Sequence, residues 1–131
     1  MQRFKDWPNR LEAYLHARNN TPFEWGFHDC VVFACGAVEV LTGVQITLPI
    51  YADAKEAVVA IKAHGGLMMA VNKALPDRQV PPFNAQRGDI VLYMQGPWPT
   101  LGVCAGRVVF TPSEEGLRGV PLERAICAWR V

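Results

Sequence analysis

The residues most capable of chemistry in this sequence lie between Trp25 and Cys35, which read Trp-Gly-Phe-His-Asp-Cys-Val-Val-Phe-Ala-Cys. Asp29 is a favourable N-cap residue. Apolar and small residues then recur at helical spacing, at Val31, Ala34, Cys35, Val38 and Leu41. This pattern predicts a buried helix that begins near Cys30. Unpaired backbone N–H groups and the positive dipole end at such a position favour a thiolate, so Cys30 is a candidate nucleophile.

A cysteine nucleophile needs a base, and the sequence has three histidines, at positions 16, 28 and 64. His28 lies two residues before Cys30 and could reach the thiol across the turn. Its alternative role is that of a turn residue that faces solvent or bonds the backbone. His64 precedes two glycines at the expected end of a helix, and His16 lies on the expected exposed side of the first helix. We assign no catalytic role to these two.

Neither Asp29 nor the remaining cysteines require a catalytic explanation. As an N-cap, Asp29 stabilises a helix by about 1 kcal/mol. The cysteines at 30, 35, 104 and 127 form no Cys-x-x-Cys pair and no zinc-like grouping with the histidines. We therefore expect no metal, no cofactor, and free buried thiols at Cys35, Cys104 and Cys127.

The elements that must position Cys30 can be predicted from hydrophobic spacing. Helices are expected over residues 8–18 and 29–42, from the Asp53–Glu56 capping box to Gly65, and over 67–75. Residues 44–52 should be extended, and the proline-rich residues 76–82 should form a connector. Strands are expected over 89–94, 101–105, 107–110 and 125–131, with turns at Gly106-Arg107 and Glu114–Gly116.

Helices followed by antiparallel strands predict an α+β fold. The 131 residues are expected to form a single domain over 1–131, with a helical part at about 1–76 and a sheet part at about 83–131.

Composition limits the possible partners. Half of the residues are apolar, the net charge is +1, and the charges are scattered without a basic or acidic run. This distribution argues against nucleic acid as a partner. No stretch approaches the roughly 20 apolar residues of a membrane span. The first residues, Met-Gln-Arg-Phe-Lys-Asp, are polar and charged, so we expect no secretion signal and synthesis inside the cell.

Two further stretches suggest local roles. In Arg87-Gly88-Asp89, the glycine and Asp89 should shape the turn into a strand. Gly96-Pro97-Trp98-Pro99 is expected to form a rigid loop with an apolar tip. Trp98 could contact another protein there or pack over the sheet edge.

Several strings in this order resemble the papain-like NlpC-type cysteine peptidases, which cut bacterial cell-wall peptides. They are Asp29-Cys30 at the helix start, the run from Arg87 to Leu92, and the run from Leu101 to Gly106. More narrowly, Pro22–Gly26 with Asp29-Cys30, and the ending Ala128-Trp129-Arg130-Val131, resemble a family of small phage and prophage proteins encoded among tail genes. The resemblance implies a papain-like domain with N-terminal helices packed on a small antiparallel sheet. It also implies that Trp25, Gly26, Asp29 and Asp89 support the fold around the site.

The chain departs from the peptidase pattern at the base. Active members place a histidine at the start of the second sheet strand, which here falls near Thr100, and no histidine follows residue 64. The next strand carries Val108, Val109, Phe110 and Thr111. General acid–base help is worth roughly 100- to 10,000-fold, so its absence argues against efficient hydrolysis.

Two hypotheses follow from the resemblance. In the first, the chain is a structural or assembly component of a phage tail, near its tip, on a catalytically degraded NlpC-like fold, with Trp98 and Trp129 as candidate contacts to other tail proteins. It would be made in the host bacterial cytoplasm and incorporated into the virion tail. In the second, it is an active cysteine hydrolase that cleaves peptidoglycan peptides during phage entry, with Cys30 as nucleophile and His28 as base.

Overall fold

The computed structural model describes residues 1–49, 52–63 and 65–131 and confirms the predicted α+β class. Helices occupy the first half of the chain, namely α1 (Trp7–Arg18), α2 (Cys30–Thr42), α3 (Ala54–Ala63) and α4 (Leu67–Ala74). Strands occupy the second half, namely β1 (Gln79–Val80), β2 (Ile90–Gln95), β3 (Trp98–Cys104), β4 (Val108–Ser113), β5 (Gly116–Pro121) and β6 (Ala125–Trp129). Two short 3₁₀ turns, η1 (Pro82–Asn84) and η2 (Leu122–Arg124), complete the fold.

The strands form one antiparallel sheet in the order β1-β6-β2-β3-β4-β5. Both faces of the central strands are buried, which explains why β2 reads as the continuous apolar run Ile-Val-Leu-Tyr. Ile90 and Leu92 face the main core beneath the helices. Val91 and Tyr93 face a second, smaller core that is closed in part by Leu122 of η2.

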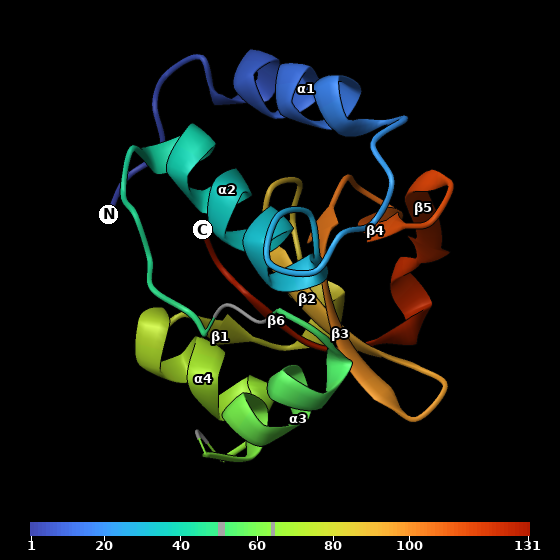
Figure 1. The fold of residues 1–131 in the computed structure, drawn as a ribbon. Helices are drawn as coiled ribbons and strands as arrows, with labels where there is room; N and C mark the ends of the chain where they lie inside the picture. The colour runs from blue at the N-terminus through green and yellow to red at the C-terminus, as the bar shows by residue number, and fades with distance from the viewer. Residues whose placement is uncertain (50–51, 64) are drawn as a thin grey trace.

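Helix α2 lies at the centre of the helical layer, with α1 on one side of it and α3 and α4 on the other (Figure 1). It is buried along most of its length and ends as expected at Gly43, which adopts φ 76°. Helix α1 is fixed against it by the Tyr14 hydroxyl, which donates to the Phe33 carbonyl at 2.8 Å. Gly36 permits this approach because a Cβ there would strike the Tyr14 hydroxyl.

The predicted helices match the observed ones closely, including the Asp53 cap, whose carboxylate accepts the Glu56 N–H at 2.8 Å. Residues 44–49, which belong to the segment expected to be extended, form neither a helix nor a strand. Positions 50 and 51 of that segment lie outside the described residues, and so does His64. The Arg87–Asp89 turn is confirmed, because Gly88 adopts φ 91° and the Asp89 N–H donates to the Gln86 carbonyl.

Three predictions about the sheet part are wrong. Strands β1 and β5 were not expected. β5 reads Gly-Leu-Arg-Gly-Val-Pro, which has little intrinsic strand preference and is held by pairing with β4. The expected loop at 96–99 is only the Gly96-Pro97 turn, because Trp98 and Pro99 belong to β3. Pro99 is tolerated there because its missing N–H would point towards β4, which pairs with β3 only at Val103 and Cys104.

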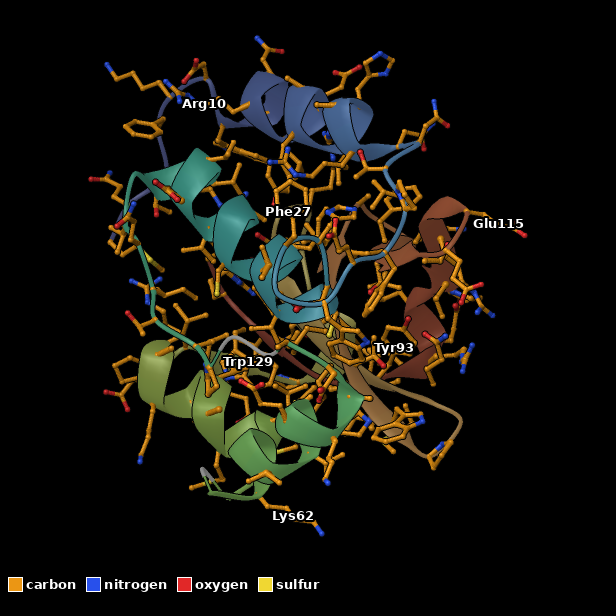
Figure 2. The ribbon with its side chains drawn as sticks, viewed as in Figure 1. Arg10, Phe27, Lys62, Tyr93, Glu115 and Trp129 are labelled. Carbon is orange, nitrogen blue, oxygen red and sulfur yellow. The ribbon has the colours of Figure 1, made fainter. Side chains whose placement is uncertain are left out.

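Trp129 is not available to a partner, so its predicted role as a contact residue is also wrong. Its side chain is fully buried between the sheet and α4 (Figure 2). Its indole N–H donates to Asn72 Oδ1 of α4 at 2.8 Å. The reason is the position of β6, which lies inside the sheet between β1 and β2.

Candidate functional site around Cys30

The loop ahead of α2 is fixed by a network of short hydrogen bonds. Asp29 caps the helix, because Oδ1 accepts from the Val32 N–H at 2.8 Å and Oδ2 accepts from the Gly26 N–H at 2.9 Å. Gly26 adopts φ 75°, a conformation that suits glycine. Glu24 and His28 form an antiparallel bridge that closes the loop. The predicted N-cap role of Asp29 is therefore confirmed.

The loop is also hydrogen-bonded to the sheet and contains an aromatic pair. The Phe23 N–H donates to the Ser113 carbonyl of β4 at 2.8 Å. Phe23 and Trp25 meet edge to face, with ring centroids 4.9 Å apart. Phe27, at the tip of the loop, is 69 % exposed (Figure 2). These contacts explain how the aromatic residues before Cys30 hold the helix start in place.

The thiol of Cys30 is less acidic than its position at the helix start suggests. Burial raises its pKa to about 11, and the negative charge of Asp29 acts in the same direction. Backbone hydrogen bonds from Leu101, Cys30 and Val31 favour the thiolate but are outweighed. The helix start therefore supplies N–H groups, as expected, while desolvation keeps the sulfur protonated at neutral pH.

Cys30 and Thr111 lie beside Leu101, at the point where β4 stops pairing with β3. Beyond the Val103 and Phe110 pair these strands no longer pair with each other, which leaves the Leu101 backbone without a strand partner on that side. The Leu101 carbonyl accepts instead from the Thr111 hydroxyl at 2.9 Å. A backbone hydrogen bond from Leu101 also lowers the pKa of Cys30, which places the sulfur close to this point of the strand. Thr111 thus gives the Leu101 carbonyl the donor that β4 does not supply there.

A buried tyrosine lies near the same point. Burial is the main reason why the pKa of Tyr93 is raised, and the Cys30 sulfur contributes in the same direction. Thr111, Arg118 and Arg124 oppose that shift. The Tyr93 hydroxyl donates to Gln95 Oε1 at 3.2 Å. Apart from the Asp29 carboxylate, which is engaged as the helix cap, the groups that act on Cys30 are backbone amides, and the neighbouring Tyr93 and Thr111 offer hydroxyls that do not act as bases at neutral pH.

No hydrogen bond between described residues joins His28 to Cys30, and neither side chain acts on the pKa of the other. The side chain of His28 is only 3 % exposed, its ring meets Phe33 edge to face with centroids 6.0 Å apart, and its Nε2 is buried without a hydrogen bond. Burial lowers its pKa, and Arg18 adds to that shift. No group that perturbs the Cys30 pKa within the described chain is a histidine. The sequence suggested a solvent-facing or backbone-bonded turn residue as the alternative to a base, and the structure shows neither for the His28 ring.

The other predicted site residues lie apart from Cys30. Asp89 lies at the start of β2, whereas Tyr93 lies at its other end, so Asp89 supports the fold from a different place. Trp98 is 54 % exposed at the tip of the β2–β3 hairpin and remains a candidate contact residue. Thr100, where a histidine was sought, only donates its hydroxyl to the Trp98 carbonyl at 3.2 Å.

The remaining cysteines are free, as predicted. Cys104 and Cys127 are buried, whereas Cys35 is only partly buried. Burial raises the pKa of Cys35 to about 11 and raises that of the other two as well. Among the described residues no group of three or more metal-ligating side chains comes together.

Sequence reasoning missed Tyr93 and gave Thr111 no role, because both follow apolar strand residues and carry no motif of their own. Their importance depends on the separation of β3 from β4, which is a tertiary feature. A polar residue that follows a run of β-branched residues, as Thr111 follows Val108 and Val109, was the available signal.

The fold and the site together define an α+β domain with a capped cysteine at the start of its central helix. The chain matches the family described as "Domain of unknown function (DUF6950)" over residues 2–131, and it belongs to that family. No curated protein matches it. In the part of the chain that the structure describes, no helix has the length and apolar character needed to cross a bilayer.

Proposed function

We propose that this chain is a structural component of a phage tail, built on a papain-like domain of the NlpC type whose cysteine site has lost catalysis. The observation that carries the loss of catalysis is the burial of the Cys30 thiol, which raises its pKa to about 11 with no histidine among the described groups that act on it. A nucleophilic cysteine needs the opposite arrangement, a thiolate beside a base.

The phage assignment has a separate basis. It rests on the resemblance of the Pro22–Gly26 string, the Asp29-Cys30 pair and the Ala128–Val131 ending to proteins encoded among tail genes. The antiparallel sheet behind a helix-start cysteine is the architecture expected from that resemblance, and so it supports the proposal. Trp98 and Phe27 offer exposed aromatic surface to neighbouring tail proteins.

The chemical half of the proposal is tested by alkylating the native chain with iodoacetamide across pH. We expect the rate at Cys30 to stay low at neutral pH and to rise only towards pH 11, in line with its pKa of about 11. A C30S variant identifies the Cys30 signal in peptide mapping. Rapid labelling of Cys30 near pH 7, together with cleavage of cell-wall peptides that C30S abolishes, would instead establish an active cysteine hydrolase.

The assembly half is tested on particles. Virions from a prophage that encodes this chain should contain it in fixed proportion to the other tail proteins, as measured by quantitative mass spectrometry. A deletion of the gene should leave tails that fail to assemble or to infect. If purified particles lack the chain and its deletion leaves tails intact, the structural role is wrong.

A further inference from the structure

The loop that precedes α2 is closed by a pair of backbone hydrogen bonds at His28. The His28 N–H donates to the Glu24 carbonyl at 2.8 Å, and the Glu24 N–H donates to the His28 carbonyl at 3.1 Å. Two aromatic side chains of this loop, Trp25 and Phe27, are exposed, and Phe27 lies at its tip (Figure 2). The ring of His28 is buried instead. The loop therefore presents aromatic surface to solvent while it buries its one imidazole.

The His28 ring lies at the contact between α1 and α2. It meets the Phe33 ring of α2 edge to face, and Phe33 in turn stacks on Tyr14 of α1 with ring centroids 5.4 Å apart. The imidazole adds apolar packing to these two rings, but its buried Nε2 has no hydrogen-bond partner among the described residues. That unsatisfied atom costs free energy for as long as the loop stays closed.

The charged groups around His28 do not favour a proton on its ring. Arg18 of α1 and Asp29 at the start of α2 are the charges that act on it. The Asp29 carboxylate is already engaged by backbone N–H groups as the helix cap. Tyr14 stays neutral, because burial raises its pKa to about 12, and the exposed Glu24 is not among the groups that act on the ring. A protonated His28 would therefore be a buried cation beside a second cation.

Opening the loop would break few contacts. The backbone pair between Glu24 and His28 closes it, and the Gly26 N–H adds one bond to the Asp29 carboxylate at 2.9 Å. The two ends of the loop have anchors that do not involve the imidazole. The Phe23 N–H donates to a carbonyl of β4 at 2.8 Å, and Asp29 caps α2 through its other oxygen. The segment between these anchors can thus move while the helix and the sheet keep their places.

We propose that uptake of a proton by His28 releases residues 24–28 from the start of α2 while the rest of the fold stays intact. Release carries Trp25 and Phe27 away from their places and uncovers the ring of Phe33. The apolar surface on this side of the molecule is then larger in acid than at neutral pH. No reaction of Cys30 takes part in this change, so the loop can open whether or not the cysteine site is active.

Proton linkage sets the size of the effect. In the open loop the imidazole meets solvent and has its ordinary pKa of 6.5, whereas burial lowers the pKa in the closed loop. Above pH 6.5 both forms are neutral, and the closed form keeps its full advantage. As the pH falls below 6.5, the ratio of open to closed loops rises by up to about tenfold per pH unit, until the pKa of the closed form is reached.

Backbone amide hydrogen exchange of the isotope-labelled full chain, followed by nuclear magnetic resonance between pH 5 and 7.5, tests this. Each rate is divided by the intrinsic rate at the same pH to give a protection factor. We expect the protection of the Glu24 and His28 amides to fall below pH 6.5 by up to about tenfold per pH unit. Up to about 2 M urea should leave this exchange unchanged, because a local opening exposes little surface. The Cys104 amide, which donates to the Asp89 carbonyl inside the sheet, is the comparison and should exchange faster in urea.

Variants identify the group that takes up the proton. In H28Q the protection of the Glu24 amide should no longer vary between pH 5 and 6.5, and only this slope is compared, because the substitution can loosen the loop at every pH. H16Q is the matched control, since His16 is exposed on α1, and it should keep the slope of the parent chain.

Three results would overturn the proposal. The first is loop protection that does not change between pH 7.5 and 5. The second is loop exchange that urea accelerates as much as that of the Cys104 amide, because the loop would then open only when the whole chain unfolds. The third is an acid slope in H28Q as steep as in the parent chain, which would place the proton on another group.

Discussion

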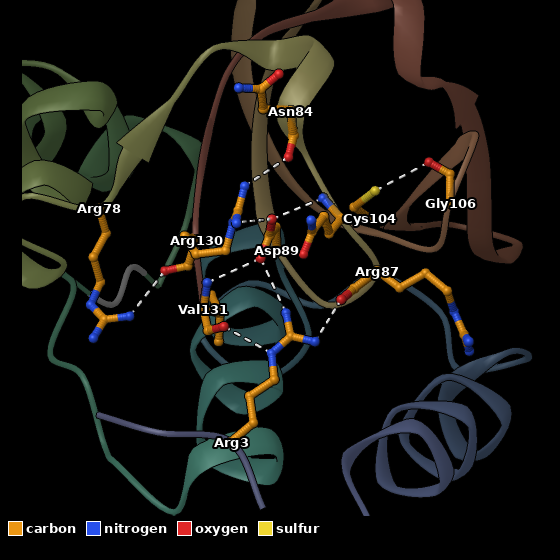
Figure 3. Close-up of polar contacts among 10 residues, drawn as sticks. Arg3, Arg78, Asn84, Arg87, Asp89, Cys104, Gly106, Arg130 and Val131 are labelled. Carbon is orange, nitrogen blue, oxygen red and sulfur yellow. Dashed lines mark hydrogen bonds and ion pairs between the residues drawn. The ribbon is translucent and has the colours of Figure 1, made fainter.

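Two buried titratable side chains, Asp89 and His28, are accommodated in opposite ways. The Asp89 side chain has no exposed surface, and its Oδ1 accepts from Arg3 Nη2 at 3.1 Å and from the Val131 N–H at 3.0 Å (Figure 3). Its Oδ2 accepts from the Gln86 N–H at 2.8 Å and lies 3.3 Å from Arg130 Nε. Every oxygen of this buried carboxylate therefore has a cation and a backbone donor.

His28 has the opposite surroundings. Its Nε2 is buried without a partner, its ring contacts Phe33, and the charges that act on its pKa are those of Arg18 and Asp29. Because desolvation is the largest effect on its pKa, the folded chain favours the neutral ring. A charged His28 would add a second positive group beside Arg18.

The contacts of Asp89 stabilise the fold, whereas the burial of His28 costs some of that stability. Arg3 also donates to the Val131 carbonyl at 2.8 Å and to the Arg87 carbonyl at 2.8 Å, so the Asp89 cluster joins both ends of the chain to the start of β2. The His28 loop holds the start of α2 while it leaves a buried polar atom unsatisfied, which costs free energy. We therefore expect a substitution at Asp89 to cost more stability than a change in the charge of His28.

The largest effect should come from D89N. The substitution removes the negative charge opposite Arg3 and Arg130 and turns an amide N–H towards a backbone donor. Breaking a buried, hydrogen-bonded ion pair on one side costs about 3 to 5 kcal/mol, and we expect a loss of that size in the free energy of unfolding. Equilibrium unfolding in urea, followed by tryptophan fluorescence, measures it.

The matched control for D89N is D6N. Asp6 pairs with Arg10 at 2.8 Å one helical turn away, but both side chains are exposed. The urea midpoint of D6N should equal that of the parent chain. If D89N unfolds at the same midpoint as D6N, the cluster around Asp89 does not hold the chain ends as the structure indicates.

A smaller effect should come from acid acting on His28. The pKa of His28 in the folded chain lies below the ordinary value of 6.5. At a pH just below 6.5 the unfolded chain therefore binds more protons at this residue than the folded chain does. The stability contributed by a neutral His28 is then complete above pH 6.5 and is lost as the pH falls below that value. The slope can reach about 1.4 kcal/mol per pH unit for a single proton. Urea midpoints between pH 5 and 8 measure it.

H28Q removes the titrating ring and should flatten this part of the profile, whereas H16Q should leave it unchanged because His16 is exposed. Comparing the slopes avoids any dependence on the absolute stability of H28Q. Equal slopes in H28Q and the parent chain between pH 5 and 6.5 would show that the burial of His28 does not control the acid response.

Asp89 and His28 also show which features of the structure could be predicted from the sequence. The turn role of Asp89 was readable from Arg87-Gly88-Asp89, and the cap role of Asp29 from its place before a helical pattern, because both are local features. The contacts of Asp89 with Arg3 and Val131 join positions that are distant in the chain, so local pattern could not supply them. The burial of His28 depends in the same way on the packing of α1 against α2.

The helices were predicted more accurately than the sheet for a related reason. Amphipathic spacing and caps fixed α1 and α2 to within a residue. β5 has no such signal and is defined by its partner β4, while β3 continues through Pro99 because β4 has already separated from it. That separation makes Cys30 a partner of the Leu101 backbone, and it could not be read from the spacing of residues 98–104.

The smallest expected effect separates the two causes that keep His28 neutral. The Arg18 guanidinium stacks over the Tyr14 ring at 3.9 Å from its centroid and lowers the pKa of His28, although burial contributes more. In R18Q the pKa of His28 should rise part of the way towards 6.5, and the acid slope should become shallower, but less so than in H28Q. The pH titration of the His28 ring proton resonances measures this directly, with R10Q as the control on the exposed side of α1. An unchanged His28 pKa in R18Q would leave desolvation as the sole cause of the lowered pKa. His28 would then be kept neutral by burial alone, whereas the buried Asp89 is stabilised by paired charges.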